Sequence, residues 1–263
     1  MLRRVDFLIL LLSIISTVGI SFIVLPIIAL FLLVDPDILV RSFLKEPSLF
    51  MEARHAFITT IEASLLSTIL LLFLGIPLAY ILARMDFPFK SLIEGIIDIP
   101  LMIPHTIAGI MILCAYGRRG LLKGLMNTLN ISIEDAFLGI VLVMMFVSFP
   151  LIVDTIKVGI MAVDPMLEMV ARGLGATRFR AFITITLPLS YRSILAGAIL
   201  AWARALSEVG AILVVAYFPK TANILTLEWL NVYGLKYAVA ISIPLVLLAL
   251  SLFIALRLLV RAK

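Results

Sequence analysis

Charged side chains are scarce in this chain: they make up 14% of its 263 residues, whereas 63% of the residues are hydrophobic. An ordinary soluble domain has about 25% charged and about 45–50% apolar residues. The mean hydropathy is strongly positive, at +1.24. The composition therefore predicts an integral membrane protein and excludes an ordinary soluble domain. The net charge of +5 would suggest nucleic acid in a soluble protein, but here it fits the Lys/Arg bias of membrane proteins, and no nucleic-acid partner is expected.

Residues that carry chemistry are also few. The single Cys114 excludes an internal disulfide and a cysteine metal cluster, and the two histidines are far apart in the sequence. No GxxxxGK[ST] sequence is present, so ATP is not expected to bind to this chain by that route. There is also no paired acid–base arrangement, no nucleophile context and no basic-aromatic surface. The sequence indicates a conduit rather than an enzyme, without a cofactor or metal of its own.

Long apolar segments dominate what is present. A spanning helix needs about 20 mostly apolar residues. Six segments meet this length: residues 7–34, 56–82, 92–116, 137–158, 193–217 and 237–260. Pro100 and Pro104 interrupt the third, while the fifth carries Arg204 and Glu208. The first segment is too long for a secretory signal and lacks a cleavage site, so a retained anchor is predicted. Polar connections are expected at 35–55, 118–135 and 218–236, with an amphipathic stretch at 44–53 that would form an interfacial helix.

Basic residues set the expected orientation. Twelve Lys and Arg residues fall on the same side as the N-terminus and eight on the other, so both termini are predicted to be cytoplasmic in a multi-pass cell-membrane (inner or plasma) protein.

Residues 164–189, here named the elbow, form a polar island between the fourth and fifth segments. Asp164-Pro165 has the composition of a helix start, with an N-cap carboxylate before a proline. Gly175 can adopt positive φ between two short helices, and Thr177 can cap the second. Pro188 marks the return to the membrane. The orientation places the elbow in the cytoplasm, where it would form a docking surface for a soluble partner.

The elbow resembles the cytoplasmic "EAA" loop of permease subunits in binding-protein-dependent ABC importers. The similarity rests on Val170-Ala171, on Gly175, and, after nine intervening residues, on Ile185-Thr186-Leu187-Pro188. The consensus acidic position falls at Met169, and Glu168 stands one place earlier. The resemblance implies an all-α, type I ABC importer permease with six spans and one domain over residues 1–263. Its coupling helices would lie at about 159–192, between spans four and five, and would dock on an ATPase.

Three further stretches extend the resemblance over almost the whole chain. Residues 75–84 resemble the end of the second span in these permeases. Residues 98–109 and 203–211 are similar to the third and fifth spans of the molybdate, tungstate and sulfate branch. The resemblance implies import of molybdate/tungstate; sulfate or thiosulfate is the alternative within the family, and an ion-gradient-driven secondary transporter is the alternative from another class. Implied partners are membrane lipid, a second copy of the chain, an extracellular or periplasmic oxyanion-binding protein, and two ABC ATPase subunits that bind ATP-Mg.

Two sets of site residues follow. The set expected to dock on the ATPase and couple it to transport comprises Glu168, Val170, Ala171, Gly175, Ala176, Thr177, Arg180, Ile185, Leu187 and Pro188. The set expected to line the pathway or gate comprises Asp98, Pro100, Pro104, His105, Thr106, Arg204, Ser207 and Glu208. Within the second set, Arg204 and Glu208 are four residues apart on one helical face and are predicted to pair. That pair could fix helix packing or contact the substrate. Asp98 needs a partner or a proton and could serve in gating or in helix capping.

Overall fold

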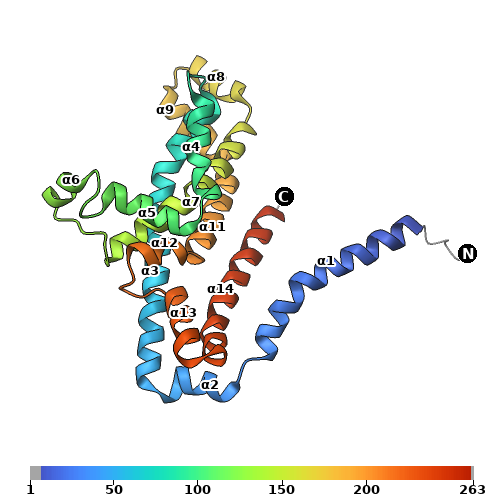
Figure 1. The fold of residues 1–263 in the computed structure, drawn as a ribbon. Helices are drawn as coiled ribbons and strands as arrows, with labels where there is room; N and C mark the ends of the chain where they lie inside the picture. The colour runs from blue at the N-terminus through green and yellow to red at the C-terminus, as the bar shows by residue number, and fades with distance from the viewer. Residues whose placement is uncertain (1–6, 262–263) are drawn as a thin grey trace, which may run out of the picture. The chain divides into compact units, whose positions relative to one another are not determined.

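The computed structural model describes residues 7–261, and over that range it is helical, without strands (Figure 1). The longer helices are α1 (Phe7–Leu32), α3 (Pro47–Arg84), α4 (Lys90–Met102), α5 (His105–Tyr116), α7 (Phe137–Met161), α8 (Pro165–Gly173), α11 (Tyr191–Leu206), α13 (Ala222–Tyr233) and α14 (Leu235–Arg261). The shorter ones are α2 (Pro36–Val40), α6 (Lys123–Thr128), α9 (Arg178–Ala181), α10 (Leu187–Leu189) and α12 (Gly210–Val215), with π-helical turns η1 (Arg41–Lys45) and η2 (Phe182–Thr186).

The chain divides into two compact units. The first comprises residues up to 51 together with 226–246, and the second comprises 52–225 together with the residues from 247 onward. In the first unit, Lys236 forms an ion pair of 3.1 Å with Asp35, and Trp229, which is 1% exposed, packs edge-on against the rings of Tyr233 and Tyr237. Helix α1 exposes apolar side chains along its length, as expected of a helix that faces lipid or another protein.

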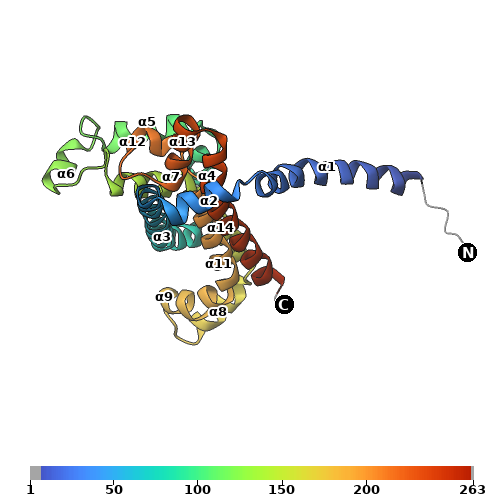
Figure 2. The ribbon, with the colours of Figure 1, turned by 90° about the horizontal axis from the view of Figure 1, so that it is seen from below.

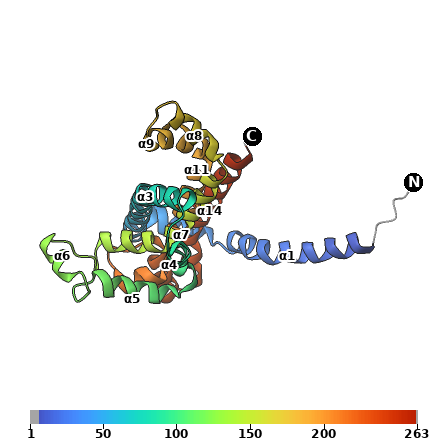
Figure 3. The same ribbon diagram turned by 90° about the horizontal axis from the view of Figure 1, so that it is seen from above.

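The second unit is built around α7, which packs most extensively against α11. The two helices approach closely because Gly159 has no side chain: a Cβ there would lie 2.1 Å from Cβ of Ser193. Ile140 and Met144 of α7, with Ala205 and Ile212, belong to a core cluster without exposed surface. Figures 2 and 3 show that α6 and the α8–α9 pair project from this bundle in different directions.

Two of the six predicted spans are not single helices: the third is divided, as its prolines predict, whereas the break in the fifth corrects the expectation. By length and apolar composition, four helices within residues 7–261 could cross a membrane: α3, α7, Leu8–Leu32 of α1 and Leu235–Leu258 of α14. A fifth candidate is a pair, residues 178–189 and 191–206, bent by 71°. The predicted third span is divided into α4 and α5. Its break lies at Ile103, which is extended (φ −82°, ψ 147°) because proline at 104 disfavours the helical conformation of the residue before it.

The predicted fifth span ends as a continuous helix at Leu206 and resumes at Gly210 as α12. Two predicted connections are also more helical than expected. Residues 44–53 form no separate interfacial helix, because α3 already begins at Pro47, and residues 218–236 contain α13.

Candidate functional site

The elbow begins as the sequence predicts. The Asp164 carboxylate accepts a hydrogen bond of 2.8 Å from the backbone N–H of Met166, which caps α8. Gly175 has φ +95°, a conformation that L side chains rarely adopt, and it reverses the chain between α8 and α9. The Thr177 hydroxyl oxygen then accepts a bond of 3.2 Å from the N–H of Arg180 and caps α9. Both predicted caps and the predicted positive φ are confirmed.

The second half of the elbow is a continuous run of turns. Ile185 lies in η2, and Leu187 and Pro188 lie in α10. The chain bends directly after Leu189, where α11 begins. The Ser190 hydroxyl at this bend donates a hydrogen bond of 2.7 Å to the carbonyl oxygen of Thr186. The bend thus lies close to the proline that predicts the return to the membrane.

One side of the elbow is apolar and exposed. Leu174 and Phe179 have 85% and 70% of their surface accessible. The other exposed large apolar residues are Met166, Leu167, Met169, Val170 and Ile183. Ala171 and Ala176 are half-buried, and Arg180 is exposed. Apolar side chains gathered on a projecting segment are typical of an interaction surface.

Glu168, by contrast, points into the protein. Its side chain is 12% exposed and forms an ion pair of 2.9 Å with Nε of Arg84, which is 11% exposed. The same carboxylate accepts hydrogen bonds of 2.9 Å from the Tyr80 hydroxyl and 2.6 Å from the Thr186 hydroxyl. Burial alone would raise the pKa of this carboxyl group, but the bonds from Thr186, Tyr80 and Arg84 together bring the pKa below its ordinary value. Glu168 is therefore held as an anion.

Sequence reasoning did not place Tyr80, Arg84 or Thr186 in the site. Tyr80 and Arg84 precede Glu168 by more than 80 residues, and no local pattern indicates that they meet it. The only available sign was an arginine at the end of an apolar segment, which is equally typical of an arginine that faces lipid headgroups.

A second cluster forms where the two broken spans meet, and we name it the double break: His105, Arg204, Ser207 and Glu208. Glu208 is 1% exposed, and its carboxylate lies 3.0 Å from Nη2 of Arg204 and 2.8 Å from Nδ1 of His105. The predicted pairing of Arg204 with Glu208 is confirmed. The His105 ring also meets the arginine, because Nη2 of Arg204 lies 3.0 Å from Nδ1 and 3.4 Å from Nε2 of the ring, so the imidazole contacts both members of the ion pair. The His105 side chain is 51% exposed.

The same glutamate holds the break in α11–α12 in place. Its second oxygen accepts a bond of 2.8 Å from the N–H of Ala211 in the first turn of α12. The Asn223 amide donates to the carbonyl oxygens of Leu206 and Glu208, at 2.7 and 3.1 Å. A Cβ on Gly210 would lie 2.8 Å from Cβ of His105, so the two breaks touch. A cavity of about 400 Å³ opens beside His105, Arg204 and Ser207.

The remaining residues of the predicted pathway set are distributed differently. Pro104 and Thr106 flank His105 and are exposed, whereas Pro100 is buried within α4. Asp98 does not join the double break, and as a residue inside α4 it caps no helix. The expected role in helix capping is therefore corrected, whereas the expected role in gating stays a prediction.

Asp98 instead lies beside Asp154 of α7, close enough for a hydrogen bond between the two side chains. Lys157 lies 3.5 Å from Asp154 and 3.2 Å from Glu94. The Oδ1 atom of Asp98 is buried, and it has no hydrogen-bond partner within the described part of the chain. In this cluster Lys157 therefore pairs with two carboxylates, and a third carboxyl group, that of Asp98, lies beside one of them.

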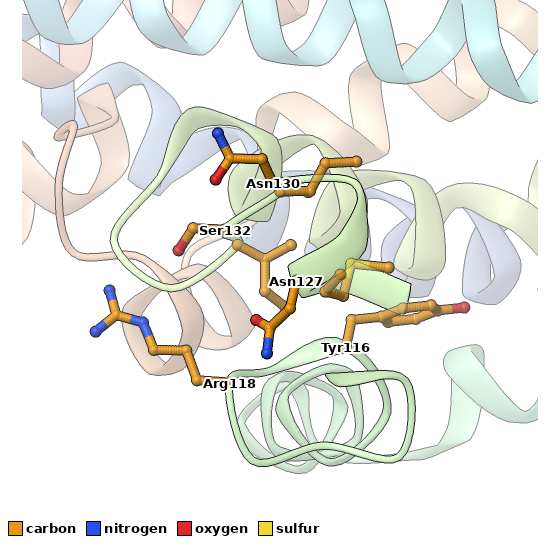
Figure 4. Close-up of a pocket in the computed structure, with 8 residues that line it drawn as sticks. Tyr116, Arg118, Asn127, Asn130 and Ser132 are labelled. Atoms are coloured by element: carbon orange, nitrogen blue, oxygen red, sulfur yellow. The ribbon is translucent and has the colours of Figure 1, made fainter. Parts of the chain in front are cut away.

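A cavity of about 410 Å³ lies away from both clusters, in the segment that contains α6 (Figure 4). Tyr116 and Arg118 line it on one side, and Asn127, Asn130 and Ser132 complete the polar wall. No residue of either predicted set contributes to it.

Comparisons with known proteins identify the family of the chain. A family model described as "Binding-protein-dependent transport system inner membrane component" matches residues 75–263. The molybdate/tungstate transport system permease protein WtpB of Thermococcus kodakarensis is 42% identical over 262 residues, covering 99% of both chains. The molybdenum transport system permease protein ModB of Escherichia coli is 39% identical over 158 residues, covering 60% of this chain and 69% of that protein.

Solved structures share the fold at lower identity. A bacterial ABC transporter involved in the import of the acidic polysaccharide alginate superposes with a TM-score of 0.71 at 18% identity, covering 98% of this chain and 96% of that one. The MetNI methionine ABC transporter gives 0.63 at 16% identity, covering 82% and 98%. The predicted all-α, type I ABC importer permease fold is thereby confirmed. This multi-pass membrane protein belongs to the family of inner-membrane components of binding-protein-dependent transport systems.

Proposed function

We propose that this chain is the permease subunit of an ABC importer that moves molybdate or tungstate into the cell with ATP hydrolysed by a separate subunit. The observation that carries the proposal is the 42% identity, over 99% of both chains, to a relative named as a molybdate/tungstate permease. Sulfate or thiosulfate remains the competing substrate, because a probable sulfate permease of Chlorokybus atmophyticus is 32% identical over 206 residues.

The elbow is the proposed contact with the ATPase. Its exposed apolar side, which includes Leu174, Phe179 and Val170, gives a partner a surface to bury. Gly175 allows the sharp reversal that presents α8 and α9 together. The contact would receive the motion of an ATPase that binds ATP-Mg, since this chain has no phosphate-binding glycine loop of its own.

The double break is the proposed gate. Two helices that stop and restart next to each other can bend there without disrupting a continuous hydrogen-bond ladder. Arg204 and Glu208 compensate each other's charge, so an anion that passes His105 and Ser207 would meet no unpaired arginine. Weak attraction suits a conduit, because tight binding of a dianion inside the membrane would slow its release.

The proposed assembly follows from the same family membership. Residues 1–263 would act as one permease domain, because the Thermococcus kodakarensis relative aligns with 99% of the chain. Two copies would pack around the pathway, with two ATPase subunits on the cytoplasmic side and one oxyanion-binding protein outside. Both termini would face the cytoplasm, in agreement with the distribution of basic residues.

Transport in reconstituted vesicles tests the proposal. The chain is co-expressed with the ATPase and binding protein encoded beside it, and uptake of radiolabelled molybdate, tungstate and sulfate is measured with and without ATP. We expect ATP-dependent uptake of molybdate and tungstate that excess sulfate does not suppress. Uptake driven by an ion gradient through this chain alone would refute the proposal, and uptake of sulfate in preference to the other two ions would refute its substrate assignment.

A further inference from the structure

We propose that Tyr80, Arg84, Glu168 and Thr186 form a clasp that makes the elbow and the end of α3 move as one body, so that Arg84 is a positioning residue for energy coupling. This inference rests on the proposed function, and it concerns how a push on the elbow reaches the membrane helices. Three side chains from two segments converge on the Glu168 carboxylate, at 2.6 to 2.9 Å.

The contacts join segments that are distant in sequence. Glu168 lies in α8, Thr186 in η2, and Tyr80 and Arg84 in the last turns of α3. Arg84 also donates a hydrogen bond of 2.7 Å from Nη2 to the carbonyl oxygen of Val163, just beyond the end of α7. One arginine therefore binds both the start of the elbow and the glutamate inside it.

Packing supports the polar contacts. The Tyr80 ring lies 4.6 Å from the ring of Phe182, centroid to centroid, so η2 contacts α3 through an aromatic pair as well as through the carboxylate. The Arg84 and Glu168 side chains are both close to nine-tenths buried. An ion pair screened from water in this way is harder to separate than an exposed pair, because neither charge can be rehydrated without opening the whole cluster.

The mechanical consequence concerns α3. This helix is 38 residues long and helical throughout, although Pro77, one turn before Tyr80, removes one backbone hydrogen bond from it. A displacement of α8 cannot be absorbed at the clasp, because the glutamate is held from three directions. It must either carry the end of α3 along or break an ion pair. The apolar residues of the elbow thus meet the partner, while Glu168 faces the permease itself.

Substitution of Arg84 in the assembled importer tests this inference. Arg84→Lys keeps the charge but removes the planar guanidinium fork that reaches Glu168 and Val163 together. We expect co-purification with the ATPase to stay at the wild-type level, and the number of ions transported per ATP hydrolysed to fall about tenfold, the change that corresponds to one lost charged hydrogen bond. Glu168→Gln should have the same effect, and the double variant should be no worse than either single variant.

The matched control is Asp86→Asn. Asp86 forms an ion pair of 3.4 Å with Lys90 just beyond the end of α3, but its side chain is fully exposed. This change should leave both the docking and the coupling ratio unaltered. A clasp variant that does not assemble is replaced by Tyr80→Phe, which removes one hydroxyl and retains the ring contact with Phe182, and the same two measurements are made.

A crosslink distinguishes positioning from a merely structural role. In a Cys114→Ser background, which removes the chain's only cysteine, Arg84→Cys and Glu168→Cys are joined by a flexible bifunctional thiol reagent. Recovery of the coupling ratio after crosslinking would support the clasp. Wild-type coupling in the Arg84→Lys and Glu168→Gln variants would overturn it. Loss of ATPase co-purification in Glu168→Gln would also overturn it, since Glu168 would then contact the partner. If wild-type protein neither binds an ATPase nor transports, the proposed function fails instead.

Discussion

Replacement of Glu208 should destabilise the protein more than replacement of any exposed glutamate. The carboxylate is 1% exposed and has three partners: the Arg204 guanidinium, the His105 ring and the N–H of Ala211. Glu208→Ala removes all three interactions at once. It leaves Arg204 charged and only 20% exposed, with no counter-charge at its former position.

The expected magnitude follows from these contacts. Removal of one member of a buried ion pair typically costs about 3–5 kcal/mol, because the remaining charge is left uncompensated. For a protein of this size, each kcal/mol lost from the free energy of unfolding lowers the melting temperature by about 2–4 °C. The melting temperature should therefore fall by about 6–20 °C. Glu208→Gln retains an oxygen that can accept from the N–H of Ala211, so its melting temperature should fall by less.

The assay is thermal unfolding of the purified chain in detergent, followed by the loss of helical circular dichroism. Glu46→Ala is the matched control, because Glu46 pairs with Arg41 at 3.4 Å while its side chain is 45% exposed. An exposed pair is worth about 0–1 kcal/mol. The double variant Arg204→Ala with Glu208→Ala should lose less stability than the sum of the two single variants, since it leaves no unpaired charge.

A melting temperature of Glu208→Ala within the range of the Glu46→Ala control would refute the reasoning. It would mean that water or a rearranged His105 compensates Arg204, and that the double break is solvated rather than closed by Glu208. Strict additivity in the double variant would refute the pairing itself.

Three further outcomes are expected. Gly175→Ala should lower the free energy of unfolding by about 1–2 kcal/mol through strain at φ +95° and should impair transport, whereas Gly173→Ala, in helical backbone, should raise it by about 0.5–1 kcal/mol. Unfolding and uptake assays compare the two variants, and equal stability would contradict the assigned turn. Gly159→Val should push α7 away from α11, because the new side chain would clash with Ser193, and should lower the free energy of unfolding by about 1–3 kcal/mol. An unchanged melting temperature would contradict that packing. Asp98→Asn should raise the melting temperature, since its amide can donate to the neighbouring carboxylate; a large decrease would show that Asp98 is needed as an anion.

Local patterns in the sequence predicted local structure well. A capping residue acts within two or three positions of itself, so Asp164 and Thr177 could be assigned as N-caps before any packing was known. Gly175 was assigned in the same way, because a residue between two helices with no Cβ is suited to positive φ. The pairing of Arg204 with Glu208 also followed from their spacing of four residues.

The break in the fifth span was missed because hydrophobicity was used to judge continuity. Residues 92–116 and 193–217 have the composition of spans, yet each is two helices. Apolar content indicates where a chain can lie in lipid, but it does not indicate whether the backbone is helical at each residue. Proline at 104 gave a local sign of the first break. The second depends on Glu208, which lies within the break, and on Asn223 of α13, which binds the carbonyl oxygens of Leu206 and Glu208.

The sequence by itself determined that the chain is a helical membrane protein with a capped polar elbow, because burial in lipid and helix capping depend on residues that are near one another along the chain. Only the tertiary structure decided that Glu168 faces Arg84 and Tyr80, that His105 meets Glu208, and that Asp98 lies beside Asp154. These contacts join residues 56 to 103 positions apart. Their geometry is set by how whole helices pack, and the packing depends on the complementary shapes of several helix surfaces rather than on any one segment.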